Sequence, residues 1–448
     1  MKTVFISAFH SIISRNILNS GILDLLAKEY KIVLLVPDYK KIYFDKYKSD
    51  RVSIEGIPQV TTRRDLLFRK ISLWLLPTKT IFLKEKSRLA SEKSYISFII
   101  YRIISISLTR WAFVNGLFRK IDYFIPDRRL FDTLIEIYKP DLIFSTDIQS
   151  ELDVILLKSS KRLRKKYIGM IRSWDNVTSK GVLRFVPDKI IVNSEITKNE
   201  LQKYDFISPE SIFVVGVPHY DRYLSFPFES KDHFFKSCGF DQSKKVILYT
   251  PIGDRYIFPN SIDEYVIKEL ASIGENLIVR LPPADTVMSI LGQDFGKNVF
   301  LEHTGVRSWK AISGKEGSKV NEISSRDDDR LITTLRHSDV VVSGPSTILI
   351  DAVLFDKPVV MVDFEVPQNT DYYQGVKRYY DYEHFDFIRS SKGVKFADSP
   401  KSLTTIISSY LKDKTIDTIS RKEIALAETY RLDSKSTQRL YEVLKNCL

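Results

Sequence analysis

Short, continuously apolar runs alternate along the chain with stretches whose apolar residues recur at helical spacing. Residues 2–7 and 31–37 are runs of the first kind, and residues 17–26 between them have the helical pattern. A strand that is apolar at every position is covered on both faces, which is typical of parallel sheets flanked by helices. The pattern therefore predicts an α/β fold built from β-α-β units.

The alternation resumes after Tyr138 and restarts after a polar, aromatic stretch at 225–244, which we interpret as a linker. The first series of further strands is predicted at 141–145, 166–171, 188–193 and 211–216. The second series is predicted at 245–250, 276–280, 299–302, 339–343 and 358–363. Since 448 residues exceed one ordinary core, we expect two Rossmann-like domains, 1–224 and 225–420, with a cleft between them.

Residues 64–120 interrupt this rhythm with two basic, aromatic stretches that have the pattern of amphipathic helices. One interpretation is a surface for an anionic membrane, with aromatic side chains in the lipid: Trp74, Phe98, Tyr101, Trp111 and Phe113. The headgroups would then meet the cations Arg63, Arg64, Arg69, Lys70, Arg102, Arg110, Arg119 and Lys120. The other interpretation is a set of helices packed on the sheet with solvated cations, and the pattern fits both.

Composition narrows the class of protein. The formal net charge of +12 favours phosphate-bearing partners, although it also serves solubility alone. The only cysteines, Cys238 and Cys447, have no metal-ligand spacing, so neither a zinc site nor a disulfide framework is expected. We see no signal peptide and no run of ~18 apolar residues, and we expect a cytoplasmic protein, at most peripheral at the inner face of the membrane.

The loops after parallel strands are where open α/β sheets bind ligands, and the loop after strand 339–343 has the clearest chemistry. Backbone N–H groups and hydroxyls at the start of the next helix form an anion site suited to a diphosphate. The residues expected to contact a nucleotide-linked donor there are Ser343, Gly344, Ser346, Thr347 and, for a sugar or ribose hydroxyl, Asp351. A plain strand-turn-helix with a Ser/Thr cap is the alternative.

The loop at 171–181 is also unusually polar for its length. Asp175 is a candidate catalytic group, and Asn176 and Lys180 are candidate contacts to donor or acceptor, unless they serve only the backbone of a capped turn. At the N-terminal end, His10 in the first β-α loop and Asp147 after strand 141–145 are candidates for the base that deprotonates an acceptor hydroxyl.

Four further loops hold candidate ligand contacts in the same position after a strand. Gly253 and Arg255 could hold phosphate, and Arg280 places a cation at a strand end. His303 could lie beside a base or ribose, and His219 could orient a ligand, although a single histidine is more often structural.

Three of these segments resemble a known group of enzymes. SGPSTILIDAVLFDKPVV, residues 343–360, resembles the donor-binding segment of CDP-glycerol glycerophosphotransferases and related GT-B glycosyltransferases. The RSWDN-TSKG loop and VVGVPHYDRY resemble bacterial surface-polysaccharide transferases of the same broad group, and the likeness spans roughly residues 140–365. It implies a GT-B fold, a nucleotide-activated donor, no catalytic metal or other cofactor, and a last helix, 421–448, that returns to the first domain.

The resemblance also ranks the functions. Glycerophosphotransferases tend to have Arg followed by Pro-His-Pro, whereas RLPP at 280–283 lacks that histidine, so a sugar donor is favoured. We therefore expect a glycosyltransferase that acts on a surface glycan, such as capsule or lipopolysaccharide, or on a lipid-linked acceptor. The alternatives are CDP-glycerol or CDP-ribitol phosphate transfer, a non-hydrolysing nucleotide-sugar 2-epimerase, and a non-enzymatic basic membrane-surface protein. No nucleic-acid-binding motif is present, so no nucleic-acid partner is expected.

Overall fold

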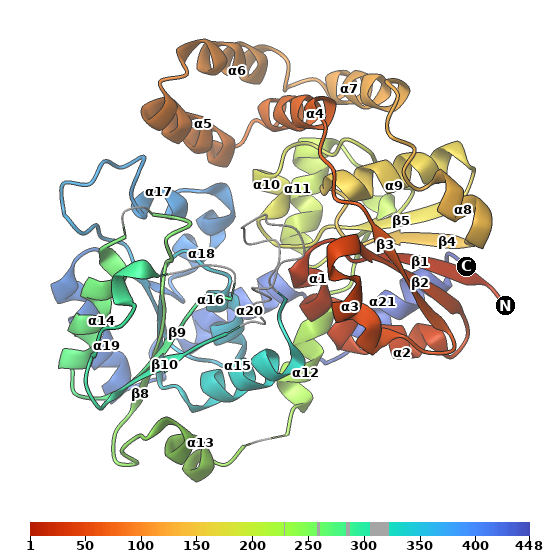
Figure 1. Cartoon of the computed structure of the whole chain (residues 1–448). Coiled ribbons are helices and arrows are strands. Elements are labelled where there is room, and N and C mark those ends of the chain that lie inside the picture. Colours follow the sequence, from red (N-terminus) through yellow and green to blue (C-terminus); the bar gives the residue numbers. More distant parts are fainter. Residues whose placement is uncertain (228, 258–259, 284–286, 305–321) are drawn as a thin grey trace. The chain divides into compact units, whose positions relative to one another are not determined.

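The computed structural model of the chain describes residues 1–227, 229–257, 260–283, 287–304 and 322–448. The chain forms two compact units: unit 1 contains residues 1–224 and 427–448, and unit 2 contains residues 225–426. Each unit holds one fully parallel sheet, so the predicted α/β class with two Rossmann-like domains is confirmed (Figure 1).

Unit 1 has a seven-stranded sheet in the order β3-β2-β1-β4-β5-β6-β7. Its strands are β1 (Thr3–Ser7), β2 (Lys31–Pro37), β3 (Val52–Ile57), β4 (Leu142–Ser145), β5 (Lys166–Met170), β6 (Ile190–Val192) and β7 (Ile212–Val214). Its helices between residues 11 and 205, apart from those in residues 63–124, are α1 (Ser11–Asn16), α2 (Ile22–Ala27), α3 (Lys41–Phe44), α8 (Asp132–Tyr138), α9 (Glu151–Arg162), α10 (Asn176–Ser179) and α11 (Glu195–Asp205). Strand β3 was not predicted, because its alternating burial lacks a continuous apolar run.

Residues 64–120 fall in four helices rather than the two stretches that the pattern suggested. They are α4 (Arg63–Trp74), α5 (Lys79–Glu92), α6 (Tyr95–Ser107) and α7 (Ala112–Phe124). Trp74 and Tyr101 are core residues of unit 1, so the expectation that they insert into lipid is wrong. None of the helices in the described ranges is long and apolar enough to cross a membrane.

Unit 2 has a six-stranded sheet in the order β10-β9-β8-β11-β12-β13. Its strands are β8 (Val246–Thr250), β9 (Asn276–Arg280), β10 (Val299–Glu302), β11 (Val340–Ser343), β12 (Val359–Val362) and β13 (Lys395–Ala397). Its helices are α13 (Lys231–Cys238), α14 (Ile262–Ser272), α15 (Ser325–His337), α16 (Ile348–Leu354), α17 (Lys377–Tyr380), α18 (Asp386–Ser391) and α19 (Pro400–Lys412). Helix α13 lies within the stretch 225–244, which the sequence predicted as a linker.

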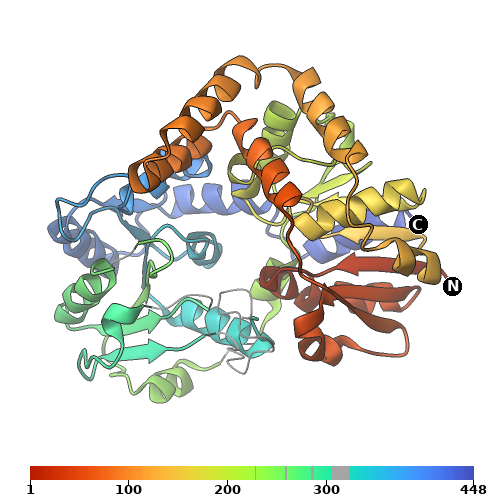
Figure 2. The ribbon, with the colours of Figure 1, turned by 45° about the horizontal axis from the view of Figure 1, so that its top comes forward.

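The chain passes between the units within two helices, α12 (Asp221–Ser225) and α20 (Thr418–Thr429). Unit 2 extends to Leu426, six residues beyond the predicted change at 420, because buried Arg421 is bound to Asp356 of unit 2 at 2.9 Å. The last helix, α21 (Ser436–Lys445), packs on α2 through Leu440 and Leu444. Both chain ends lie at one edge of unit 1 (Figures 1 and 2).

Candidate functional site

The strand order of unit 1 reverses between β1 and β4, where a parallel sheet leaves room for a ligand beyond its carboxyl ends. Asp153, in the first turn of α9, lies directly behind this point. Its Oδ1 atom accepts hydrogen bonds from Ser7 Oγ at the end of β1 and from Ser145 Oγ at the end of β4. The Thr146 N–H donates to Ser7 Oγ at 2.9 Å. This network ties the two strand ends together and fixes the loop that follows β4.

The Asp153 network makes stability depend on pH. Complete burial, together with the nearby Asp147 carboxylate, raises the pKa of Asp153 to about 7, whereas the unfolded chain ionises it near 3.8. Between these values the folded state holds a proton that the unfolded state has lost, so the free energy of unfolding falls as pH rises. For this group the fall is on the order of 4 kcal/mol from about pH 4 to pH 7, and it stops above that range.

The variant Asp153→Asn cannot ionise, so it is expected to lack this slope. Urea unfolding of both proteins should show the stability difference moving in favour of the variant up to about pH 7 and staying level above it. A difference that is the same at every pH would contradict a raised pKa for Asp153.

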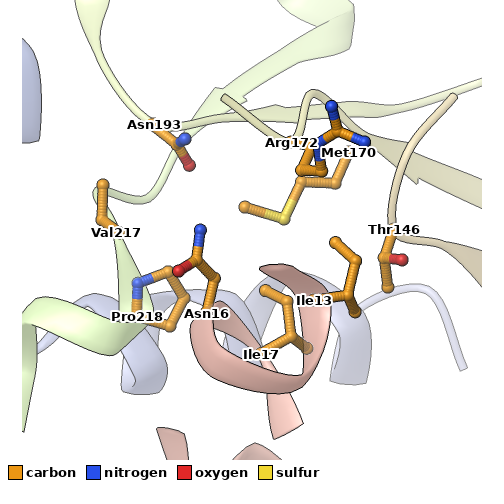
Figure 3. A pocket seen from close by; sticks show the side chains of 9 residues that line it. All are labelled: Ile13, Asn16, Ile17, Thr146, Met170, Arg172, Asn193, Val217 and Pro218. Carbon is orange, nitrogen blue, oxygen red and sulfur yellow. The ribbon is translucent and has the colours of Figure 1, made fainter. Parts of the chain in front are cut away.

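A small hollow lies at the carboxyl edge of the unit 1 sheet, and the space of about 210 Å³ around it includes open solvent. Figure 3 shows that Asn16 of α1 and Asn193 after β6 turn their amides toward the same space, beside the end of Met170. The described residues that line it are Ile13, Asn16, Ile17, Thr146, Met170, Arg172, Asn193, Val217 and Pro218. The lining thus combines apolar side chains with two amides and a guanidinium.

Several buried polar atoms at this edge have no hydrogen-bond partner among the described residues. They include both side-chain polar atoms of Asn176, Oδ1 of Asn193, Nε of Arg172 and Oδ1 of Asp147. Asn176 is 1% exposed and Asn193 is 5% exposed, so bulk water does not satisfy them. Burying an unpaired polar group costs about 1–3 kcal/mol, and a group of them in one place points to a polar ligand.

Arg172 and Asp147 form an ion pair across the ends of β5 and β4, with 2.5 Å between Nη1 and Oδ2. Both side chains are largely buried, so the carboxylate holds the guanidinium in one orientation at the wall of the hollow. Asp147 does not itself line the hollow. Its direct effect is to position Arg172, and its proposed role as a base stays a prediction.

The polar loop at 171–181 is anchored to the helices that precede it in unit 1. Thr78 Oγ1 at the start of α5 donates to the Thr178 carbonyl at 2.8 Å, and Lys84 Nζ donates to the Ser179 carbonyl at 3.0 Å. Gly181 has a φ of +94° and lies against the α4 backbone, where a Cβ would approach the carbonyl carbon of Ser72 to 2.8 Å. Helices α4 and α5 therefore fix the place of Asn176.

The other residues predicted in this loop are less enclosed. Asp175 is half-buried, with Oδ2 accepting from Ser179 Oγ at 3.4 Å, and the Lys180 side chain is exposed. Asp175, Asn176 and Lys180 thus lie in one segment of unit 1, but the hollow is lined by Arg172 from the start of that segment.

His10 is the N-cap of α1, and its Nδ1 atom accepts the Ile12 N–H at 3.2 Å. A neutral imidazole that accepts through Nδ1 carries its proton on Nε2. In this arrangement the outer nitrogen is a donor, so deprotonation of an acceptor by Nε2 requires the cap to open. The role of His10 as a base remains a prediction.

His219 is fully buried, with its ring at 5.1 Å from that of Tyr223 in an edge-to-face contact. Burial, with Arg15 and Arg222 nearby, holds the pKa of His219 well below its usual value, so the ring is neutral. Its neighbours in sequence, Val217 and Pro218, line the hollow, whereas His219 packs behind them.

In unit 2 the strand order reverses between β8 and β11, and the two strand ends meet through their hydroxyls. Thr250 Oγ1 donates to Ser343 Oγ at 2.6 Å, and both side chains are buried. Gly344 follows at once, and a Cβ there would lie 2.3 Å from Ile252 Cγ1 and 3.3 Å from its Cα. Glycine is therefore needed for the loop after β8 to pass beside the loop after β11.

The loop after β8 is organised by Asp263, a residue that the sequence did not single out. Its carboxylate accepts the N–H groups of Ile252 at 2.8 Å and Gly253 at 2.9 Å, and it also binds the Asn260 amide at 2.7 Å. The Gly253 N–H, which we expected to hold phosphate, is thus already donated within the unit. The Arg255 side chain in the same loop is exposed.

The polar side chains in and after the loop that follows β11 differ in how exposed they are. Helix α16 starts at Ile348 with Thr347 as N-cap, and Ser346 Oγ accepts the Ile348 N–H at 3.4 Å. Ser346 and Thr347 are half-buried, whereas Ser343 and Asp351 are buried. The first pair is therefore better placed to meet a ligand than the second.

Arg280 at the end of β9 is bound by its own unit. Its guanidinium pairs with Glu302 at the end of β10 and donates to the Asp327 carbonyl at 2.9 Å. Arg330 binds the same glutamate at 2.6 Å, so two cations share one carboxylate. His303, the next residue after Glu302, is exposed. No group of metal-ligating side chains is found in the described ranges, and the expected independence from metal stays a prediction.

The most informative residues that sequence reasoning missed are Asn193, Asp153 and Asp263. Asn193 follows β6 directly and lines the hollow, so the rule that ligands bind after parallel strands could have selected it. Asp153 and Asp263 lie in the first turns of α9 and α14. An acidic residue there is explained by its favourable interaction with the helix dipole, so the sequence gives no reason to expect another role. Their partners are visible only in three dimensions.

Comparison by sequence finds no matching family model and no matching curated protein. Solved structures are similar at low identity. A putative UDP-N-acetylglucosamine 2-epimerase from Listeria monocytogenes has a TM-score of 0.57 and 12% identity, over 100% of this chain and 96% of that one. The UDP-GlcNAc 2-epimerase from Neisseria meningitidis, bound to UDP-GlcNAc, has a TM-score of 0.54 and 12% identity, over the whole of both chains.

A wall teichoic acid polymerase is similar as well, with a TM-score of 0.51 and 12% identity over 99% of this chain and 88% of that one. At such identity the likeness concerns the fold alone. The chain has the GT-B fold, with two parallel-sheet Rossmann-like domains.

Proposed function

We propose that the chain is a nucleotide-sugar-dependent glycosyltransferase that builds a surface glycan, with unit 1 binding the acceptor and unit 2 the donor. One observation carries the proposal: Asn193, whose Oδ1 atom is buried without a partner among the described residues, lines the same hollow as Arg172 at the carboxyl edge of the unit 1 sheet. Amide and guanidinium groups pair well with the hydroxyls of a sugar, and apolar side chains suit the face of its ring.

In unit 2 the half-buried hydroxyls of Ser346 and Thr347 would meet the donor diphosphate, with Arg255 and His303 as further exposed contacts. An acceptor hydroxyl loses its proton to a base and attacks the anomeric carbon, and the bond to the diphosphate breaks. The leaving diphosphate gains negative charge, which preorganised donors stabilise. The candidates for the base are His10, Asp147 and Asp175. We propose that the reaction needs no metal or other cofactor.

The products separate this proposal from its rivals on the same fold. Transfer of a sugar releases a nucleoside diphosphate only when acceptor is present. A 2-epimerase converts the donor without acceptor, and transfer of glycerol phosphate or ribitol phosphate from a CDP donor releases CMP. Incubation of the full chain with a panel of UDP-, GDP- and CDP-linked donors, with and without membrane glycan, therefore decides among them. Release of CMP, or conversion without acceptor, would overturn glycosyl transfer.

Nucleoside diphosphate binding gives the corresponding prediction for unit 2. Thermal shift against UDP, GDP, CDP and CMP should show one preferred nucleotide, because a ligand at 100 times its Kd adds about 2.7 kcal/mol to stability. Ser346→Ala with Thr347→Ala should weaken that binding about 30-fold, since each of the two lost hydrogen bonds is worth about 1 kcal/mol. The matched control is Ser324→Ala, which removes the α15 cap and should lower stability without changing nucleotide affinity.

A further inference from the structure

Helix α7 is amphipathic with its polar side inward. Asn115 Nδ2 donates to the Tyr204 carbonyl at 3.1 Å, and Arg119 Nη2 binds Asp205 at 2.8 Å. Asp122 is completely buried and forms an ion pair with Lys158 Nζ at 2.8 Å. These contacts and the buried ring of Phe118 hold α7 on unit 1, and they leave Phe113, Leu117 and Ile121 on the outside.

The outward side chains of α6 and α7 form a continuous apolar stripe on each helix. On α6 the exposed residues recur at helical spacing, from Ile96, which is 77% exposed, through Ile99 to Ile103. On α7 they are Phe113, which is 67% exposed, Leu117 and Ile121. We call these six residues the outer face. The helices follow each other along the chain and lie at the margin of unit 1 (Figure 1).

Folding does not account for the outer face, because it is made of side chains that folding leaves in water. Single exposed apolar residues are ordinary, but a set ordered along two successive helices marks an interaction site. On the opposite side of α6 the apolar side chains are covered on folding, since Tyr101 is buried and Phe98 and Ile104 pack on the unit 1 core.

The positive charge of this segment indicates which kind of partner binds the outer face. No acidic residue occurs from Ser94 to Ile121, whereas Lys93, Arg110 and Lys120 are exposed beside the outer face. Between residues 63 and 125 there are 13 Lys and Arg and four Asp and Glu, so this segment carries nine of the 12 net positive charges of the chain. Two of the four acids, Asp65 and Asp122, are buried and paired with arginine. A protein partner with an apolar surface would not require this excess of cations.

The length of the helices fixes the mode of contact. An α6 of 13 residues is about 20 Å long, too short for a hydrocarbon core of about 30 Å. Apolar stripes flanked by cations are typical of helices that lie in the headgroup region with their apolar side chains in the acyl boundary. We infer that the outer face of α6 and α7 binds the surface of an anionic lipid membrane, with Lys93, Arg110 and Lys120 at the phosphates. This inference goes beyond the proposed function and does not depend on it.

Vesicle flotation with the full chain and no nucleotide tests the inference. Binding is expected to vesicles that contain phosphatidylglycerol, to be at least 10-fold weaker to phosphatidylcholine alone, and to weaken with salt. Ile99→Asn with Phe113→Asn should lower binding about 100-fold, because two large apolar side chains no longer enter the lipid. Arg110→Gln with Lys120→Gln should lower it about 30-fold.

The matched control is Ile42→Asn with Ile137→Asn, which changes two apolar residues on α3 and α8 of the same unit that are at least as exposed as Ile99 and Phe113. It should bind vesicles like the wild type. Equal loss in the control and the Ile99/Phe113 variant would overturn the inference, as would a wild type that does not float with phosphatidylglycerol vesicles. Analytical ultracentrifugation tests whether a second copy of the chain binds the outer face instead. That alternative would hold if the wild type were a dimer, the Ile99/Phe113 variant were a monomer, and neither bound vesicles.

Discussion

Asn193→Leu is expected to make the folded chain more stable and to lower the proposed transfer activity strongly. The Oδ1 atom of Asn193 is buried without a partner, so an apolar side chain of similar size removes a cost of about 1–3 kcal/mol. If the amide recognises an acceptor hydroxyl, kcat/KM for the acceptor should fall about 10- to 100-fold, because a hydrogen bond made only with ligand is lost. Urea unfolding and the transfer assay measure the two effects separately.

The matched control for this result is Asn115→Leu. Asn115 is as buried as Asn193, but its amide donates to the Tyr204 carbonyl at 3.1 Å. This variant should lose stability by about 1–3 kcal/mol and keep its acceptor kinetics. If Asn193→Leu instead lost stability like the control, the amide would be serving the fold, and the hollow would no longer carry the proposed function.

Arg172→Met is expected to have the largest combined effect of any single change in unit 1. It leaves the Asp147 carboxylate buried without its counter-charge, which costs about 3–5 kcal/mol. It also removes the one guanidinium among the described residues that line the hollow, so we expect turnover to fall at least about 100-fold. The double variant Arg172→Met with Asp147→Asn should recover most of the stability, because no unpaired charge remains, and should stay inactive.

A second ion pair in unit 1 provides the comparison. Arg162 binds Asp132 at 2.6 Å between α9 and α8, and this pair is more exposed than the pair of Arg172 and Asp147. Arg162 also lies 3.6 Å from the buried Asp127 carboxylate, so Arg162→Met should cost about 1–3 kcal/mol and leave turnover unchanged. A double variant that regained activity along with stability would show that Arg172 acts only as a structural partner of Asp147.

The sheets could be predicted because their strands are buried on both faces, which leaves continuous apolar runs such as KIVLLVP at β2. The same rule placed the polar loops at the strand ends, including the segment with Asn176. The side on which a helix packs could not be predicted. For α7 the periodicity reveals an apolar stripe, and the buried pairs of Asp122 and Arg119 with distant residues turn that stripe outward.

Arg280 shows a second limit of sequence reasoning. A cation at a strand end was a reasonable diphosphate contact, but its partner Glu302 lies on the neighbouring strand, 22 residues away. Only the register of β9 against β10, which places Arg280 opposite Glu302, brings them together. His10 is different, because a histidine two residues before the N–H that it accepts is a local signal that could have been recognised as a cap.

The anchoring of the loop at 171–181 has a consequence for how the chain would respond to its surroundings. Thr78, the N-cap of α5, and Lys84 of α5 donate hydrogen bonds to carbonyls of α10, and α5 packs directly on α6. If α6 docks on a membrane as inferred, a displacement of α6 would reach the segment of Asn176 through α5 alone. Thermodynamic linkage makes such a relay work in both directions. If docking raised the affinity for a sugar by some factor, the bound sugar would raise the affinity for the docked surface by the same factor.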